Sequence, residues 1–252
     1  MLNMSKLLSR LSNRKWWVQE VVAKTPNATE RVLLKAVKNG DGYVRYSVAE
    51  HPNATERVLL TALKDTQPDV RCAAVNNPNA TERVLLDALK DEHWCVRAAA
   101  ARNANATEQM LREAMEDEDW RVREAVAGNP NATEQMLLKA VVEKYWPVRV
   151  PAAGNPNATE QVLIEALKED NWQNWFVRKA AAGNSNATEQ VLMMAIMDDN
   201  PEVRLAAAYN PNATEPILKR AACDTDKRVC KAVAHNEKAS TIDKIIGALG
   251  GL

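Results

Sequence analysis

The tetrapeptide Asn-Ala-Thr-Glu occurs eight times in this sequence, and its spacing constrains the fold more than any other feature. Its first residues are Asn27, Asn53, Asn79, Asn105, Asn131, Asn157, Asn186 and Asn212, spaced 26 residues apart except for one interval of 29. Self-similarity at a fixed period of this size is the signature of repeat proteins, whose units bury their apolar faces against their neighbours. The chain is therefore expected to be an array of 26-residue units.

Each unit contains two segments with helical periodicity. Counting the first Asn of each tetrapeptide as repeat position 0, apolar residues stand at positions 5, 6, 9 and 10, which share one face of a helix. Pro216, at position 4, fits this helix only if it begins just after Thr214, because a proline deeper in the helix would remove a backbone hydrogen bond. We therefore expect threonine as the N-cap. A shorter segment at positions 15–24 ends at Asn-Pro and fits either an α- or a 3₁₀-helix.

These two segments predict an all-α fold, a right-handed α-solenoid of about nine 26-residue two-helix repeats. No segment combines alternating hydrophobicity with the β-branched residues typical of strands. We expect a single helical-repeat domain over residues 1–252, with a degenerate N-terminal cap repeat at 1–26, eight full repeats at 27–236 and a C-terminal cap helix at 237–252.

The composition excludes several classes of protein. Thirty-three basic and 33 acidic residues balance, which argues against a chain built mainly to coat nucleic acid. No apolar run approaches the roughly 18–20 residues that cross a bilayer, and the start lacks a secretory signal, so a cytoplasmic protein without membrane contact is expected. Four scattered cysteines give no disulfide framework, and neither a metal site nor a cofactor is expected.

One recurring motif resembles a known family. The pattern V-R-x-A-A-A-x-N-P-x-x-T, seen at residues 122–133 and 203–214, is similar to that of the leucine-rich repeat variant family. The resemblance implies a solenoid of alternating α- and 3₁₀-helices with a general interaction role and no defined reaction. Some members carry a cysteine-ligated iron–sulfur cluster near the N-terminus, but the first cysteine here is Cys72, so that cofactor is not implied. HEAT-type repeats remain the structural alternative.

In a stacked array, equal repeat positions form ladders. Arginine occupies position 18 (Arg45, Arg71, Arg97, Arg123, Arg149, Arg178, Arg204), with Cys230 in the last repeat, and glutamate occupies position 3 in all eight repeats. We expect each Arg to pair with the Glu of the next repeat, as a structural contact. Asparagines at positions 0 and 24 are expected to hydrogen-bond to turn backbone.

Tryptophan recurs at position 15, and two roles are open for it. The residues are Trp16, Trp94, Trp120, Trp146 and Trp172. Packing between neighbouring repeats is the favoured role, and a binding surface is the alternative, because Trp is enriched at binding hot spots.

The repeat is broken in its sixth and seventh units, where we expect the binding site. The sixth unit gains three residues around Trp172, Trp175 and Phe176, and the seventh places Met193, Met194 and Met197 on a helix that is apolar nearly all round. Methionine- and tryptophan-rich surfaces are typical of protein-binding sites. The prediction is a non-catalytic scaffold that binds a protein partner or a second copy here, although the insertion could instead fold back over the Met helix.

The alternative function is binding of nucleic acid or another polyanion. The first helices of the first three repeats carry a basic stripe that includes Arg31, Lys35, Arg57 and Arg83, which could contact phosphates, while Trp94 and Trp120 could stack on bases. An enzyme is not expected, because the three histidines are isolated and no catalytic motif occurs, and no small-molecule substrate is inferred.

Overall fold

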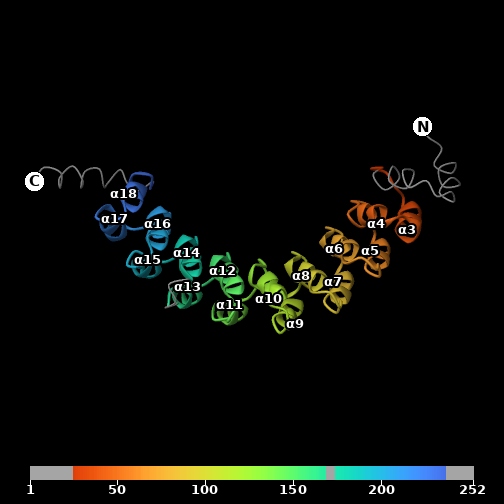
Figure 1. Ribbon diagram of the computed structural model, residues 1–252, viewed down its shortest axis with the longest axis horizontal. Coiled ribbons are helices and arrows are strands. Elements are labelled where there is room, and N and C mark those ends of the chain that lie inside the picture. Colours follow the sequence, from red (N-terminus) through yellow and green to blue (C-terminus); the bar gives the residue numbers. More distant parts are fainter. Residues whose placement is uncertain (1–24, 169–173, 237–252) are drawn as a thin grey trace, which may run out of the picture. The chain divides into compact units, whose positions relative to one another are not determined.

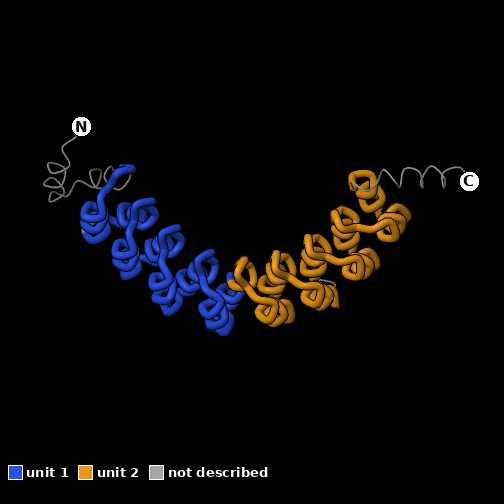
Figure 2. The backbone as a smooth tube through the Cα atoms, turned by 180° about the vertical axis from the view of Figure 1, so that it is seen from behind, with its two compact units in different colours: residues 1–125 blue, residues 126–252 orange. Residues whose placement is uncertain are grey.

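A computed structural model describes residues 25–168 and 174–236, which fold into sixteen α-helices without a strand among them. The chain divides into two compact units, residues 1–125 and 126–252 (Figure 2). The predicted caps at 1–26 and 237–252 lie almost wholly outside the described residues. Each described repeat contributes one pair of helices, as the sequence predicts.

The first unit contains helices α3 to α9 and most of α10. Their bounds are α3 (Glu30–Asn39), α4 (Gly42–Ala49), α5 (Glu56–Ala62), α6 (Pro68–Asn76), α7 (Glu82–Ala88), α8 (Trp94–Arg102), α9 (Glu108–Ala114) and α10 (Trp120–Ala127). The first helices of successive repeats, α3, α5 and α7, pack side by side, and the second helices α4, α6 and α8 form a parallel row (Figure 1). Helix α10 begins in the first unit and ends in the second.

The second unit repeats this arrangement. Its helices are α11 (Glu134–Val141), α12 (Trp146–Gly154), α13 (Glu160–Leu167), α14 (Trp175–Gly183), α15 (Glu189–Ala195), α16 (Pro201–Tyr209), α17 (Glu215–Ala222) and α18 (Lys227–Ala234). Here α12, α14, α16 and α18 form the row of second helices, each packed against the next (Figure 1). No helix in the described parts of the chain is long and apolar enough to cross a membrane.

The helix boundaries follow from local chemistry. In every described repeat the first helix begins at Glu, directly after a threonine N-cap in extended conformation, so the threonine prediction is confirmed. The Glu carboxylate at N1 is favoured by the helix dipole. The second segment, for which an α- or a 3₁₀-helix was open, is an α-helix of eight or nine residues.

The core is a ladder of small and medium apolar side chains. On the inner face of each described first helix, a leucine pairs with a valine, methionine or isoleucine, as Leu59 does with Val58, and both of these are fully buried. Burying such a side chain contributes roughly 1.5–3 kcal/mol. Alanines such as Ala62 and Ala74 are also fully buried, and their size lets neighbouring helices approach closely.

The arginine ladder holds the repeats together, but its partner is an aspartate. Arg71 donates from Nε and Nη2 to the Asp91 carboxylate at 2.7 and 2.8 Å, and from Nη1 to the Asp65 carbonyl at 2.8 Å. The same pairing across neighbouring repeats joins Arg45 to Asp65, Arg97 to Asp117, Arg178 to Asp198 and Arg204 to Asp224. The expected Arg–Glu pairing is therefore wrong in its acidic partner, although the direction, from one repeat to the next, is right.

The glutamates at position 3 instead accept hydrogen bonds from threonine. The N-cap hydroxyls of Thr55, Thr81 and Thr214 donate to the Glu of the preceding repeat at 2.9, 2.8 and 2.7 Å. Each aspartate of the arginine ladder has a second role, because its carboxylate also accepts from the backbone N–H two residues on, as Asp91 does from His93 at 2.9 Å. A shorter side chain suits this turn, which explains why aspartate stands there.

The asparagine ladders hydrogen-bond to turn backbone, as expected, and also connect repeats. Asn155 is 2% exposed. Its Nδ2 donates to the carbonyls of Ala127 and Asn129 at 2.7 and 2.9 Å, while its Oδ1 accepts from Asn157 N–H at 2.8 Å. In the first repeat His51 takes this position, with Nδ1 accepting from Asn53 N–H and Nε2 3.1 Å from the Thr25 carbonyl. Nε2 therefore carries the proton in the neutral ring.

Candidate functional site

An exposed group of aromatic rings lies at the starts of α12 and α14 in the second unit. The rings of Trp146 and Phe176 stack with centroids 5.8 Å apart, and those of Trp175 and Phe176 with centroids 3.9 Å apart. Trp146 is 52% exposed and Phe176 45%. Tyr145, which precedes Trp146, is 44% exposed. We call Tyr145, Trp146, Trp175 and Phe176 the aromatic surface.

The stacking follows from the repeat geometry. A residue at position 15 lies beside position 16 of the next repeat, which is why Phe176 packs on Trp146. In the first unit the same positions bring the Arg121 guanidinium 3.7 Å from the centre of the Trp94 ring. The favoured role of the Trp ladder, packing between neighbouring repeats, matches these two contacts. Where the covering residue is Phe176, the packed rings also form an exposed apolar surface.

The insertion shifts the tryptophan ladder by three residues. Trp175 begins α14 as Trp146 begins α12, so Trp175 takes the place that the spacing assigned to Trp172. Trp172 and the rest of 169–173 lie outside the described residues. The alternative that the insertion folds back over the Met helix, α15, therefore stays a prediction.

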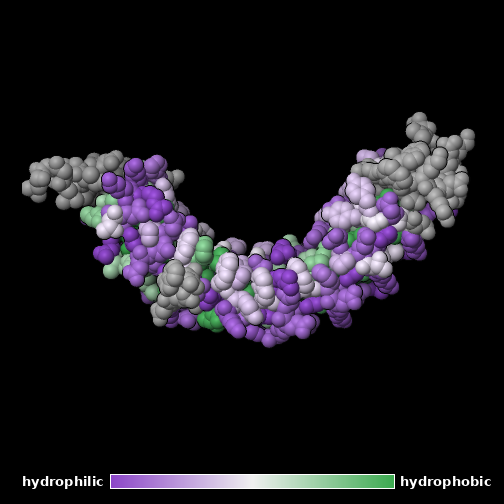
Figure 3. Space-filling view, viewed as in Figure 1, coloured by the Kyte–Doolittle hydropathy of each residue, from purple (hydrophilic) through white to green (hydrophobic). Residues whose placement is uncertain are grey.

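The three predicted methionines are exposed on another helix. Met193 and Met194 lie on α15 and Met197 follows it, with exposed fractions of 38%, 38% and 57%. They belong to the row of first helices, whereas Trp175 and Phe176 belong to the row of second helices. In Figure 3, hydrophilic residues cover most of the visible face and hydrophobic ones form small, separate patches.

The predicted basic stripe borders two adjoining depressions on the first unit. One of about 390 Å³ is lined by Glu30, Arg31, Leu34, Lys35, Lys38 and Arg57, and its neighbour of about 490 Å³ by Lys38, Glu56, Arg57, Leu60, Thr61, Lys64 and Arg83. Lys38 and Arg57 line both. We call this surface the basic groove. The other members of the predicted set, Trp94 and Trp120, start α8 and α10 in the other row of helices and do not line it.

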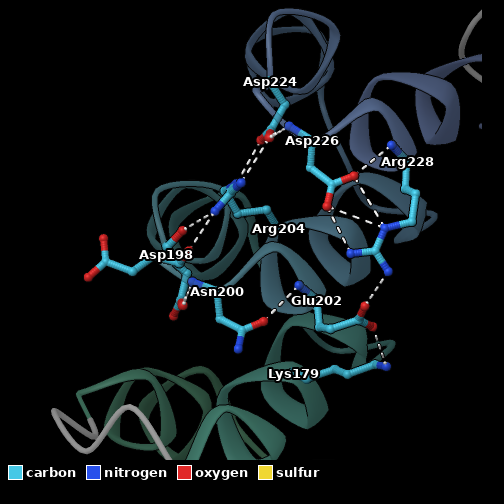
Figure 4. A network of polar contacts seen from close by, with 9 residues as sticks. Lys179, Asp198, Asn200, Glu202, Arg204, Asp224, Asp226 and Arg228 are labelled. Atoms are coloured by element: carbon cyan, nitrogen blue, oxygen red, sulfur yellow. Dashed lines mark hydrogen bonds and ion pairs between the residues drawn. The ribbon is translucent and has the colours of Figure 1, made fainter.

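A polar network joins the sixth, seventh and eighth repeats (Figure 4). The Glu202 carboxylate lies between Lys179, 3.1 Å away, and Arg228, 2.7 Å away, and Arg228 also pairs with Asp226. Hydrogen bonds from Lys179 and Arg228 lower the pKa of Glu202. The network fixes the Lys179 side chain, whose Nζ lies 5.5 Å from the Trp175 ring centre.

The lowered pKa of Asp224 indicates that acid will reduce the stability of the fold. The hydrogen bonds from Arg204 lower the pKa of Asp224 below its ordinary value of 3.8, against the effect of burial. A carboxyl with a depressed pKa in the folded state stabilises the fold fully above its unfolded pKa, and this contribution is lost as the pH falls through the folded pKa. We expect the urea midpoint of unfolding to fall steeply below about pH 4.

A double substitution tests this assignment. The Arg204→Met/Asp224→Asn variant removes both charges and keeps an acceptor for the Asp226 N–H, which Asp224 holds at 2.8 Å. Its urea midpoint should fall less between pH 5 and pH 3 than that of the wild type, as measured by circular dichroism. An equal fall in both proteins would contradict the role of Asp224.

Comparison with solved structures identifies the architecture. No family model matches the sequence, and no curated protein matches it. A structure described as a leucine-rich repeat variant with a novel repetitive structural motif superposes with a TM-score of 0.61, covering 89% of this chain and 87% of that chain at 18% identity. The chain has the leucine-rich repeat variant fold.

The leucine-rich repeat variant fold explains why these surfaces are laid out in rows. Each repeat presents the same positions at the same place, so one unusual residue in a ladder changes the surface locally. The resemblance in sequence implied alternating α- and 3₁₀-helices. In this chain the second helices are instead α-helical over eight or nine residues. In α12 and α16 the residue at position 15 begins the helix and the asparagine at position 24 is its C-cap.

Proposed function

We propose that the chain is a non-catalytic scaffold that binds a protein segment on the aromatic surface. The observation that carries this proposal is the stacking of three rings, two of which are about half exposed, on packed helices. Exposed aromatic side chains on a rigid frame provide large contact area at little cost in conformational entropy. Met193, Met194 and Met197 provide a second, more adaptable apolar surface on the same unit.

The charges around the rings define the chemistry of the partner. Lys144 Nζ lies 5.9 Å from the Tyr145 ring centre and Lys179 Nζ 5.5 Å from that of Trp175, so a lysine stands at each end of the surface. The rings would take an aromatic or aliphatic anchor, and the lysines would pair with acidic side chains beside it, although Glu202, 3.1 Å from Lys179, lowers the charge that Lys179 offers to a partner. The proposed partner is therefore a peptide segment with an apolar anchor between Asp or Glu residues.

A selection experiment tests the chemistry and the place together. A random peptide library displayed on phage is selected on the wild-type protein, and binding of the enriched peptides is measured by fluorescence anisotropy. We expect the enriched peptides to contain an apolar anchor flanked by acidic residues. The Phe176→Ala variant should bind these peptides about tenfold or more weakly, because it lacks the ring that stacks on both tryptophans.

The matched control is Tyr209→Ala. Tyr209 is an exposed aromatic residue of the same unit, 50% exposed, at the end of α16 and outside the aromatic surface. Its substitution should leave the affinity unchanged. Peptides that bind the Phe176→Ala variant as tightly as the wild type would contradict the proposal. If binding is lost only in a Met193→Ser/Met194→Ser variant, the binding site lies on α15. If the wild type self-associates in analytical ultracentrifugation and Phe176→Ala abolishes this association, the partner is a second copy of the chain.

A second candidate function is binding of single-stranded nucleic acid in the basic groove. The supporting observation is that Arg31, Lys35, Lys38, Arg57 and Arg83 converge on two adjoining depressions. A row of cations along a groove tracks a phosphate backbone and releases its counterions. Glu30 and Glu56 also line the groove, and Arg83 Nη1 lies 3.9 Å from Glu56, which lowers the charge available to phosphate.

Salt dependence distinguishes this candidate. With a fluorescent oligothymidylate, Arg57→Ala should reduce the slope of log K against log salt concentration by about 0.7, the contribution of one phosphate contact to a single strand. Arg112→Ala, which changes an exposed arginine on α9 outside the groove, is the control and should leave the slope unchanged. No difference between the two variants would contradict nucleic-acid binding in the groove.

A further inference from the structure

Two cysteines that are far apart in sequence lie together in the first unit. Cys72 belongs to α6 and Cys95 to α8, and their Sγ atoms are 2.9 Å apart. We propose that Cys72 and Cys95 form a disulfide that locks the second helix of one repeat to the second helix of the next. Their spacing resembles no redox motif, so the local sequence does not indicate that the two cysteines are neighbours.

The repeat geometry brings these two positions together. Cys72 stands at position 19 of its repeat and Cys95 at position 16 of the next. In the second unit the equivalent positions are held by Lys179 and Glu202, whose charged groups are 3.1 Å apart. The contact is therefore a property of neighbouring second helices, and a disulfide needs only a small closure of the sulfur–sulfur distance.

Both thiols can be reached from solvent. Cys72 and Cys95 are half-buried, so a small reagent has access to them without unfolding of the chain. Cys230, by contrast, donates its thiol to the Asp224 carbonyl at 3.1 Å, and Cys223 is exposed at the end of α17. These two lie in one repeat, but the structure pairs the thiols of Cys72 and Cys95 instead.

The oxidant is a low-molecular-weight disulfide such as glutathione disulfide. The Cys95 thiolate attacks one sulfur of the oxidant, so a mixed disulfide forms and one glutathione thiolate leaves. The Cys72 thiolate then attacks the Cys95 sulfur and releases the second glutathione. Two protein thiols are oxidised to one disulfide, one glutathione disulfide is reduced to two thiols, and the protons of Cys72 and Cys95 pass through solvent to the leaving thiolates.

The environment of Cys72 sets this order of attack. Burial raises the pKa of the Cys72 thiol, and the hydrogen bond shared with Cys95 raises it further. A raised pKa disfavours the thiolate, which is the attacking species. Cys72 therefore reacts second, when the mixed disulfide is already held beside it.

Peptide mapping of the full-length chain tests the proposal. The wild-type protein is incubated with glutathione disulfide, free thiols are alkylated, and a tryptic digest is examined by mass spectrometry. Cleavage after Arg71, Arg83, Lys90 and Arg97 leaves Cys72 in peptide 72–83 and Cys95 in peptide 91–97, apart from Cys223 and Cys230. We expect these two peptides joined by a disulfide within one chain. Both peptides alkylated, both carrying glutathione, or a link only between two chains would overturn the proposal.

A stability measurement tests the lock. Oxidation should raise the melting temperature of the wild type by about 5 °C or more, reversibly on reduction, because the bond closes a loop across two repeats. Cys72→Ser and Cys95→Ser variants keep Cys223 and Cys230 and should show no rise. An oxidised wild-type protein that contains the linked peptides but melts at the reduced temperature would overturn the locking role. Since the readout is the wild-type protein, it does not depend on the folding of either variant.

Discussion

Replacing Arg71 with alanine is expected to lower the free energy of unfolding by about 3–5 kcal/mol. The side chains of Arg71 and Asp91 are only 6% and 9% exposed, so the substitution leaves the Asp91 carboxylate in a site that water hardly reaches. It also leaves the Asp65 carbonyl without the guanidinium donor. Urea unfolding followed by circular dichroism measures the loss, and hydrogen exchange should show α6 and α8 opening first.

Two further variants show whether the loss of stability depends on the burial of the Arg71–Asp91 pair or only on the presence of an ion pair. Arg112 and Glu108 also form a salt bridge, but their side chains are 56% and 57% exposed, so Arg112→Ala should cost no more than about 1 kcal/mol. The Arg71→Met/Asp91→Asn variant removes both charges and keeps an acceptor for the His93 N–H. It should recover most of the stability lost in Arg71→Ala. If Arg71→Ala costs no more than Arg112→Ala, the arginine ladder contributes little to stability.

The partner of the arginine ladder shows what the repeat period can and cannot predict. Glutamate recurs at position 3 in every repeat, and an acidic residue recurs at position 12 in every repeat after the first, so the period alone does not choose between these two partners for the arginine. The topology of the helix pair does. Position 18 lies near the start of the second helix, close to the turn between the two helices, which holds position 12. Position 3 lies at the start of the first helix, at the end away from this turn. A helical hairpin drawn from the sequence would have indicated aspartate.

The helix boundaries, in contrast, depend only on local chemistry and could be predicted. Pro216 excludes a helix that begins at Asn212, and the threonine caps follow from that single residue. The two-helix unit likewise follows from residues that are near in sequence. Contacts across 20 to 31 residues, such as those of Arg71 and Asn184, depend on how one repeat stacks on the next.

The candidate surfaces could be predicted only in part from the sequence. Phe176 and Trp175 stood out because they break the repeat, and the basic residues because they share one helix stripe. The contribution of Trp146 was missed as a site residue, since its partner Phe176 lies in the next repeat at a different position. Cys72 and Cys95 were missed for the same reason. In both cases the signal is the pairing of positions 15 or 19 with position 16 of the next repeat.

The second large effect is expected from Asn155→Ala, which should lower the free energy of unfolding by about 2–4 kcal/mol. Asn155 is 2% exposed, and its amide group satisfies the Ala127 and Asn129 carbonyls and the Asn157 N–H. Truncation leaves these three backbone groups without the side-chain partner in a buried turn, where water replaces it poorly. The measurement is again urea unfolding, with hydrogen exchange at residues 127–129 and at Asn157.

Two matched substitutions show whether hydrogen bonding or shape is responsible. Asn155→Asp keeps the shape and the acceptor for Asn157, but it places carboxylate oxygens against two carbonyls, so at pH 7 it should destabilise at least as much as alanine. His51→Asn restores the ladder residue in the first repeat and should change stability by less than about 1 kcal/mol, because Asn53 N–H keeps an acceptor. An Asn155→Asp variant as stable as the wild type would mean that the carbonyls of Ala127 and Asn129 do not need the donor, and that the asparagine ladder acts only within its own turn.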